Sequence, residues 1–114
     1  MKVEVHGHRG SRGTHPENTL PGFSEARDAG CDYFEIDVHL SADDQVVVFH
    51  DDEVTARVCS ACLGAEEREF APRRVRSLTL AELRNFEVGQ RPDARHPRRL
   101  SLPGQRIPTL RETL

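Results

Sequence analysis

The sequence predicts an α/β fold, because strand and helix patterns alternate along its first 50 residues. Apolar and polar side chains alternate over residues 3–8 and again over residues 33–40, as is typical of strands with two different faces. Between them, residues 19–30 carry apolar side chains at helical spacing and end at a glycine. At 114 residues, the chain is long enough for one domain with a hydrophobic core.

The first helix has a clear start and stop in the sequence. A glycine-rich turn over residues 7–13 separates it from the first strand. Asn18 or Thr19 is a suitable N-cap, and Pro21 falls in the first turn, where its missing N–H costs nothing. Gly30 is expected to end the segment.

A β-hairpin is expected next. Residues 33–40 form its first arm, residues 41–45 its turn, and residues 46–50 its returning arm. The following stretch, residues 54–76, is polar and has no sustained periodicity. We therefore expect irregular structure there.

A second helix is predicted after this stretch. Thr79 and Glu82 form a capping box, and Leu78 and Leu83 have the spacing of a hydrophobic staple. The pattern predicts a helix that ends near Gly89. An irregular stretch rich in arginine and proline then extends to about residue 104.

A third helix is predicted to begin at the end of the chain. Thr109 and Glu112 form another capping box, but only about one turn follows. Helices in globular proteins average about three turns, so the sequence looks cut off.

Composition argues against several classes of partner. The net charge is −3; residues 1–67 hold 14 acids and 5 basic residues, whereas residues 68–106 hold 4 acids and 10 arginines. No aromatic residues interleave the arginine pairs, which favours a solvated loop over a nucleic-acid surface. No apolar run is long enough for a signal peptide or a membrane span. We expect a cytoplasmic protein with no stable membrane anchor, or a periplasmic or secreted one if a leader was omitted.

The cysteines give a weak signal. Cys59 and Cys62 form a CxxC pair, but one pair without a second cannot close a tetrahedral zinc site. A reduced, incidental pair in a loop is the expected state.

The polar face of residues 33–40 is the first candidate for chemistry. Glu35, Asp37 and His39 share that face, and the two carboxylates are about 6–7 Å apart at Cα. One interpretation is an amphipathic surface strand whose polar face meets water. The other is a cation site, for which oxygen ligands favour Mg²⁺ or Ca²⁺ over zinc. The residues by themselves leave both open.

Two further clusters would complete a site if their strands are neighbours. His8 and His50 suit acid–base chemistry near neutral pH, one accepting a proton and one returning it. Arg9 offers a planar, charged fork for a phosphate. Taken singly, each is equally compatible with an ordinary surface residue. The remaining histidines are weaker candidates: His6, His15, His39 and His96.

Four motifs in a fixed order carry a resemblance to a known family. They are His8-Arg9-Gly10, Pro16-Glu17-Asn18-Thr19, Glu35-Ile36-Asp37 and His50-Asp51. With them the chain resembles the glycerophosphodiester phosphodiesterase family. The resemblance covers essentially the whole chain, continues through residues 77–83 to residues 107–110, and is weakest at residues 54–76 and 90–104.

The resemblance implies a fold and a set of site residues. The fold is a (β/α)8 TIM barrel, of which this chain would supply two to three N-terminal βα units plus the β-hairpin. His8 and His50 would form the acid–base pair, and Arg9 would hold the phosphate. Glu35 and Asp37 would bind a divalent cation, Mg²⁺ or Ca²⁺. We assign His8 as the base and His50 as the acid.

The resemblance also implies a reaction and a missing part. Family substrates are small glycerophosphodiesters such as glycerophosphocholine, cleaved to glycerol 3-phosphate and an alcohol in lipid and glycerol metabolism. The family's third metal ligand, a carboxylate, comes from a strand beyond the last residue here, so this chain contains none. A closed barrel needs about 250 residues. We therefore expect residues 1–114 to be an N-terminal part of the domain, with weak or no activity unless the missing barrel half or another chain completes it.

Three smaller implications follow. The hairpin turn usually carries Asp-Gly in the family, so Asp43-Asp44 is expected to form a less favourable turn here. His39 falls at a variable position and is not expected to be a ligand. The two alternative functions are a non-catalytic phosphate- or metal-binding remnant and a phospholipase D-like relative acting on sphingomyelin.

Overall fold

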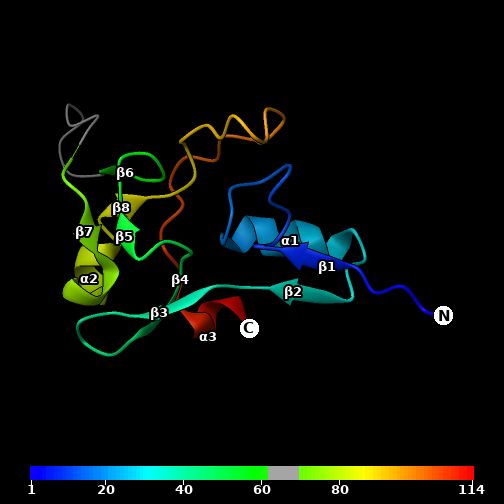
Figure 1. Cartoon of the computed structure of the whole chain (residues 1–114), viewed down its shortest axis with the longest axis horizontal. Helices are drawn as coiled ribbons and strands as arrows, with labels where there is room; N and C mark the ends of the chain where they lie inside the picture. Colours follow the sequence, from blue (N-terminus) through cyan, green and yellow to red (C-terminus); the bar gives the residue numbers. More distant parts are fainter. Residues whose placement is uncertain (62–69) are drawn as a thin grey trace.

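The computed structural model describes residues 1–61 and 70–114, which form a flattened, elongated body of 49 × 32 × 19 Å (Figure 1). Its elements in chain order are β1 (His6–His8), α1 (Leu20–Asp28), β2 (Tyr33–Glu35), β3 (Val38–Leu40), β4 (Val46–Val48), β5 (Glu53–Val54), β6 (Ser60–Ala61), β7 (Arg73–Arg74), the 3₁₀ turn η1 (Val75–Ser77), α2 (Leu80–Leu83), β8 (Phe86–Glu87) and α3 (Leu110–Thr113). The described strands pair in four two-stranded sheets and close no barrel.

The first three elements form a βαβ unit, as the sequence predicts. β1 pairs in parallel with β2, and α1 connects them. Thr19 is the N-cap, and its hydroxyl accepts a hydrogen bond from the Gly22 N–H at 3.3 Å. Phe23 on α1 packs against Phe34 on β2, with ring centroids 5.5 Å apart. The first strand is shorter than predicted, because only residues 6–8 pair regularly with β2.

The predicted strand over residues 33–40 is two strands. β2 pairs with β1, whereas β3 pairs antiparallel with β4, and Ile36 and Asp37 lie between them. The chain changes partner at this point, which interrupts the regular ladder. The hairpin of β3 and β4 is confirmed, with Val38 opposite Val48. The apolar side of this segment is largely uncovered, since Val38 is 48% exposed.

The prediction of a helix that ends near Gly89 is wrong. The Thr79 cap forms as expected, with its hydroxyl accepting from the Glu82 N–H at 3.2 Å, but α2 ends at Leu83. The chain then enters β8, which pairs with β6. The Gly89 backbone lies against the segment that contains Leu102, whose N–H donates a hydrogen bond to the Gly89 carbonyl at 2.8 Å.

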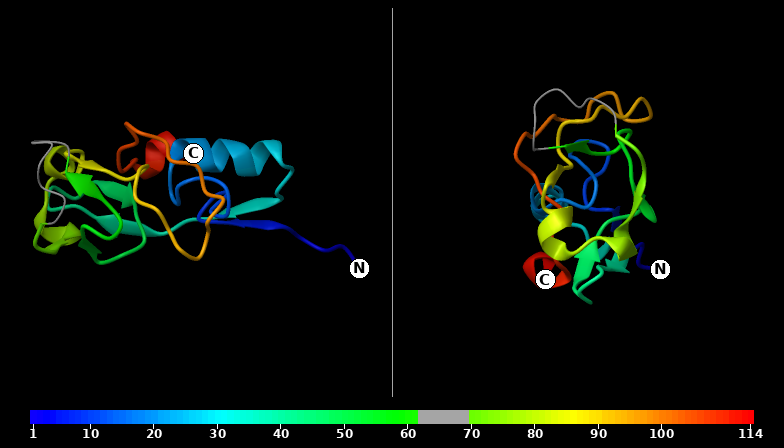
Figure 2. Two further views of the ribbon diagram at one scale, coloured as in Figure 1. Left: turned by 90° about the horizontal axis from the view of Figure 1, so that it is seen from above. Right: turned by 90° about the vertical axis from the view of Figure 1, so that its left-hand side faces the viewer.

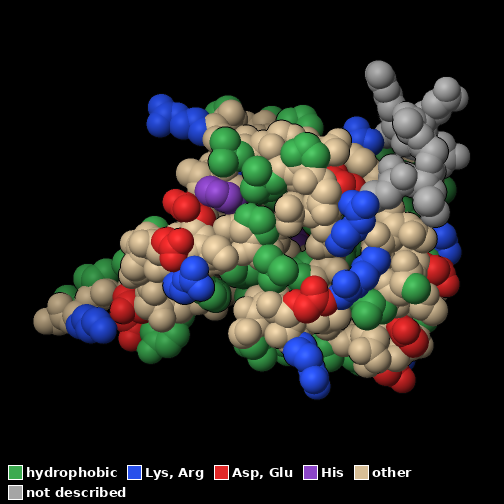
Figure 3. Space-filling view, turned by 180° about the vertical axis from the view of Figure 1, so that it is seen from behind, with side chains coloured by type: hydrophobic (Ala, Val, Ile, Leu, Met, Phe, Trp, Pro, Cys, Tyr) green, Lys and Arg blue, Asp and Glu red, His purple; other side chains and the backbone are tan. Residues whose placement is uncertain are grey.

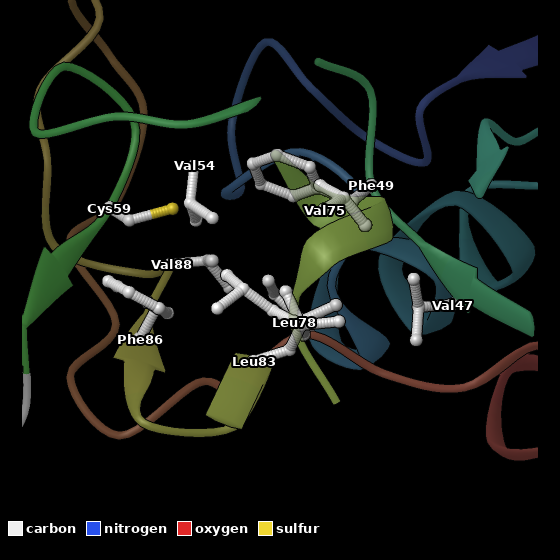
Figure 4. Close-up of a cluster of buried hydrophobic side chains, with 10 residues drawn as sticks. Val47, Phe49, Val54, Cys59, Val75, Leu78, Leu83, Phe86 and Val88 are labelled. Atoms are coloured by element: carbon white, nitrogen blue, oxygen red, sulfur yellow. The ribbon is translucent and has the colours of Figure 1, made fainter. Parts of the chain in front are cut away.

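The hydrophobic core lies around β4, α2 and β8. Its buried members are Val47, Phe49, Val54, Cys59, Val75, Leu78, Leu83, Phe86, Val88 and Ile107. Figure 4 shows Leu78 and Leu83 between Val47 on one side and Phe86 on the other. Both leucines of the predicted staple are fully buried here. Because this cluster needs Phe86 and Val88 inside, burial outweighs the local helical pattern beyond α2.

The irregular stretch 54–76 contains short pieces of structure. β5 pairs with β7, and β6 with β8, in two-residue ladders. Cys59 is buried in the core, whereas Cys62 lies outside the described residues, so the expectation for the CxxC pair stays open.

α3 lies between the two ends of the body. Thr109 caps it by accepting from Glu112 N–H at 3.2 Å, as the capping box predicts, and forms an isolated antiparallel bridge with Val47. α3 contacts both β4 and α1, and Figure 2 shows it beside α1. The pKa of Glu112 in this helix is lowered. Burial by itself would raise this pKa, but hydrogen bonds from Arg84 and Thr109 outweigh that effect.

Candidate active site

Arg9 is the centre of a polar network at the end of β1. Its backbone N–H donates to the Glu35 carbonyl at 3.0 Å and lies 3.2 Å from Glu35 Oε2. Its guanidinium donates from Nη1 to Glu17 Oε2 at 2.8 Å, and its Nε lies 3.6 Å from Asp37 Oδ2. The side chain is only 12% exposed. Arg9 is therefore held rigidly by three carboxylates, which fixes the orientation of its remaining N–H groups.

The two predicted ligand carboxylates belong to this network. Glu35 lies opposite His8 in the β1–β2 ladder, and its Oε2 is 3.7 Å from His8 Nε2. Asp37 follows β2, and its Oδ2 accepts a hydrogen bond from Asn18 Nδ2 at 3.0 Å. Four predicted site residues thus meet at one edge of the β1–β2 sheet.

His50 comes from the other side of the hairpin. Phe49 N–H donates to the Asp37 carbonyl at 2.9 Å, which places the start of the His50 loop beside the network. His50 Nδ1 is 2.6 Å from Asp51 Oδ1, and Arg57 donates to Asp51 Oδ2 at 3.0 Å. Because Nδ1 is engaged, Nε2 is the nitrogen left for a substrate. Among the described residues, no hydrogen bond or ion pair joins His50 to His8 directly.

His39 has a positioning contact. Its Nε2 lies 3.0 Å from the His50 backbone carbonyl, so it fixes the loop that carries His50.

Three residues of the site were missed by the sequence interpretation. Glu17 orients Arg9, Asn18 orients Asp37, and Asp51 orients His50. The signal was present, because Glu17 and Asn18 precede the Thr19 cap in one of the four motifs. The segment is predicted as a helix start and is one of the family motifs, but none of its residues is predicted for the site.

The donor set fits part of a site for a hard divalent cation. Glu35 and Asp37 offer carboxylate oxygens, the ligand type that Mg²⁺ and Ca²⁺ prefer. Asn18 is buried beside Asp37, and its Oδ1 has no hydrogen-bond partner among the described residues. Within the described ranges, no group of three His, Cys, Asp or Glu side chains forms a complete metal centre. The remaining ligands would have to come from groups other than these two carboxylates.

Comparison with known proteins identifies the family. Residues 8–114 match the model of the glycerophosphoryl diester phosphodiesterase family. The chain belongs to this family. A glycerophosphodiester phosphodiesterase from Caldanaerobacter subterraneus is 32% identical over 112 residues, which cover 98% of this chain and 39% of that protein.

Solved structures of family proteins show the same arrangement of elements. One from Silicibacter pomeroyi has a TM-score of 0.88 and 36% identity, with 97% of this chain and 39% of that chain covered. A phosphodiesterase from Oleispira antarctica in complex with sn-glycerol 3-phosphate has a TM-score of 0.73 and 32% identity, with 97% and 38% covered. These matches confirm the α/β fold class. The chain spans about two fifths of the length of the family proteins it matches.

Among the residues that the structure describes, no helix has the length and apolar character needed to cross a bilayer. The face in Figure 3 mixes hydrophobic and charged side chains across its surface.

Proposed function

We propose that this chain carries the N-terminal part of the site of a divalent-metal-dependent glycerophosphodiester phosphodiesterase. The reaction would cleave a glycerophosphodiester to glycerol 3-phosphate and an alcohol. The observation that carries the proposal is the convergence of His8, Arg9, Glu35 and Asp37 at one sheet edge, in a member of this family.

The side chains have distinct roles in this proposal. Arg9 holds a phosphate oxygen with the N–H groups that its carboxylate partners leave available. His8 Nε2 accepts a proton from the hydroxyl that attacks phosphorus, His50 Nε2 returns a proton to the leaving alcohol, and one water is consumed in reaching glycerol 3-phosphate. Asp51 keeps His50 in the orientation that this requires, through the 2.6 Å contact at Nδ1. A Mg²⁺ or Ca²⁺ ion at Glu35 and Asp37 would supply positive charge to the phosphoryl oxygens.

The proposal includes a partial barrel. Residues 1–114 would form two to three N-terminal βα units plus the hairpin, and the rest of the (β/α)8 domain would supply the third carboxylate. The shared two fifths of the family proteins' length supports this division. We therefore expect the isolated chain to bind the glycerol phosphate group but to hydrolyse glycerophosphocholine at or near background.

Calorimetric titration and a hydrolysis assay test the proposal together. In Mg²⁺ or Ca²⁺, sn-glycerol 3-phosphate should bind, and Arg9→Gln should weaken binding about tenfold, because charge-assisted hydrogen bonds are lost. His96→Ala, a loop residue outside the Arg9 network, is the control and should bind as the parent chain does. Equal binding by Arg9→Gln and the parent chain would count against the site.

The hydrolysis assay separates the alternatives. Robust turnover that His8→Ala abolishes would refute the expected incompleteness while supporting the enzyme. Binding without turnover, even after the remainder of the barrel is restored, would favour the non-catalytic remnant. This alternative is worth testing because the metal centre is incomplete among the described residues. Sphingomyelin offered beside glycerophosphocholine tests the phospholipase D-like relative.

A further inference from the structure

A cavity of about 310 Å³ lies beside the His50–Asp51 pair and is not used by the proposed reaction. Its polar wall consists of Glu17, Arg57, Asp93, Arg95 and Arg99. We call this cavity the arginine pocket. Its volume is at the lower end of the range of small-molecule sites, about 300–1,000 Å³.

The arginine pocket is built from two distant segments of the sequence. The stretch after β8 returns to the loop after β1, where Leu100 N–H donates to the Thr14 carbonyl at 2.8 Å. Figure 1 shows this returning segment, in orange, over the dark-blue loop, and Figure 2 shows the same neighbourhood from above. Arg99 adds a side-chain tether by donating to the Arg91 carbonyl at 2.8 Å. The wall is therefore held in place by hydrogen bonds.

Positive charge outnumbers negative charge around the pocket. Asp93 forms ion pairs with three guanidiniums: Arg95 at 3.1 Å, Arg12 at 3.8 Å and Arg99 at 3.8 Å. The hydrogen bond from Arg95 is the main reason that the pKa of Asp93 is lowered to about 2. The other wall carboxylate, Glu17, is already engaged by the arginine that the proposed site assigns to phosphate. Among the residues that line the pocket, three arginines therefore stand against two carboxylates, Glu17 and Asp93.

Arg99 has a buried N–H group without a hydrogen-bond acceptor among the described residues. The Arg99 side chain is 8% exposed, and its Nη1 has no hydrogen-bond partner among the described residues. Buried N–H groups of a cation are normally paired, because an unpaired one loses its hydration without compensation. An anion in the pocket would offset this surplus of positive charge.

The pocket is connected directly to the chemistry. Arg57 lines it and also donates to Asp51 Oδ2 at 3.0 Å, while the other oxygen of Asp51 holds His50. His50 is the residue assigned to protonate the leaving alcohol. A group in the pocket would therefore belong to the leaving alcohol and not to the glycerol phosphate half.

We propose that the arginine pocket binds a carboxylate or a phosphate carried by the leaving alcohol, so that the preferred substrates are glycerophosphodiesters with an anionic head group. This inference rests on the proposed function. A choline head group fits the pocket poorly, because a positive wall repels a quaternary ammonium and no aromatic ring is among the described lining residues.

The test is calorimetric titration of this chain in Mg²⁺ with matched diesters. Glycerophosphoglycerol has a neutral leaving alcohol, and its terminally phosphorylated derivative differs only by the added anion. A third diester with glycerate as the alcohol separates a carboxylate from a phosphate. We expect the anionic diesters to bind at least about fivefold tighter than glycerophosphoglycerol. This preference should shrink as salt is raised from 50 to 500 mM, since exposed charges are screened.

Arg95→Gln is the informative variant. The Arg95 side chain is 61% exposed, so its replacement is expected to fold. The variant should lose most of the preference for the anionic diesters and bind glycerophosphoglycerol as before. Arg98→Gln, an exposed arginine of the same loop that does not line the pocket, is the matched control and should keep the preference.

The outcomes separate this inference from the proposed function. Equal affinity for neutral and anionic diesters, or equal losses in the two variants, would overturn the arginine pocket and leave the phosphodiesterase proposal intact. A preference that depends on Arg95, combined with no hydrolysis by a completed barrel, would refute the phosphodiesterase and keep the anion site. Failure of all three diesters to bind would refute both.

Discussion

Different interactions stabilise the two ends of the molecule. The core region, around β4, α2 and β8, buries ten hydrophobic side chains in one cluster. The βαβ region, made of β1, α1, β2 and the loop after β1, leaves Val5, Tyr33 and Phe34 at 52%, 56% and 38% exposed. It buries Phe23 and Ala26, and ion pairs and hydrogen bonds around Arg9 add to this packing. His8, Arg9 and Glu35 of the proposed site lie in the region with the less extensive packing, and His50 reaches it from the end of β4.

Two of the three described non-glycine residues with a left-handed backbone lie in the βαβ region. Arg9 and Asn18 have φ values of 54° and 52°, in the left-handed region that non-glycine residues seldom adopt. Both residues make the contacts that orient Glu35 and Asp37. Strain of this kind persists only where surrounding contacts enforce it, and it clusters at functional sites. The core region therefore supplies stability, and the βαβ region uses polar contacts to hold a strained site.

The largest expected effect is the loss of a core side chain. Leu78 is fully buried at the centre of the core region. Leu78→Ala should lower the free energy of unfolding by about 3 kcal/mol, because the transfer free energy of the removed atoms is lost and the cavity left behind adds a further cost. Urea denaturation followed by circular dichroism measures it. Leu100→Ala, at a 52% exposed leucine, should change stability by less than about 0.5 kcal/mol. Similar losses at both positions would contradict the division.

A backbone change should be the next largest and should affect the βαβ region. Gly10 has φ +85°, and a Cβ there would lie 2.9 Å from the Gly22 carbonyl carbon in α1. Gly10→Ala should cost about 2 kcal/mol, from the strained φ and from the displaced backbone. Gly13→Ala meets no atom within 4 Å and is the control. Denaturation of both variants measures the difference. If Gly10→Ala is as stable as Gly13→Ala, the loop after β1 can rearrange at little cost in free energy.

Local signals in the sequence predicted much of the fold. The caps at Thr19, Thr79 and Thr109 all form, because capping depends on residues within one turn. The strand patterns of residues 33–40 and 46–50 on either side of a turn likewise predicted the hairpin. These features depend on neighbours in the chain, so a short stretch contains the necessary information.

Features that depend on distant partners escaped prediction. The interruption at Ile36 and Asp37 arises because β2 and β3 pair with different strands. The strand at Phe86 forms because the core region needs that side chain inside. The strand pattern and the family resemblance brought His8 and Glu35 together as a hypothesis, whereas the contact of Arg12 with Asp93 joins segments 81 residues apart and has no local signature.

An acid-sensitive contact between the βαβ region and the returning loop provides the third prediction. The pKa of Asp93 is lowered from 3.8 to about 2, first by the hydrogen bond from Arg95. Its stabilisation is therefore complete above about pH 4 and is lost as the pH falls through 2. Asp93→Asn should cost about 1 kcal/mol at pH 7, after allowance for solvent screening. Denaturation at pH 7, 4 and 2 should show the difference from the parent chain shrinking between pH 4 and pH 2. A difference that is constant with pH would mean that the charge is unimportant.

The smallest expected effect concerns strain outside the βαβ region. Asp44 has φ 58° in the hairpin turn, where glycine would be relaxed, and it forms an ion pair with Arg76 at 2.8 Å. Both side chains are more than half exposed, so the pair contributes only about 0.2–0.5 kcal/mol, whereas the left-handed backbone costs about 1 kcal/mol. Asp44→Gly should therefore stabilise the chain by about 0.5 kcal/mol. Asp44→Asn tolerates the same backbone but loses the charge, and it should be slightly less stable than the parent chain. Thermal denaturation of the three chains measures the order, Gly above Asp above Asn. If the glycine variant is the least stable, the ion pair outweighs the strain, and the hairpin turn is held by the same kind of contact as the βαβ region.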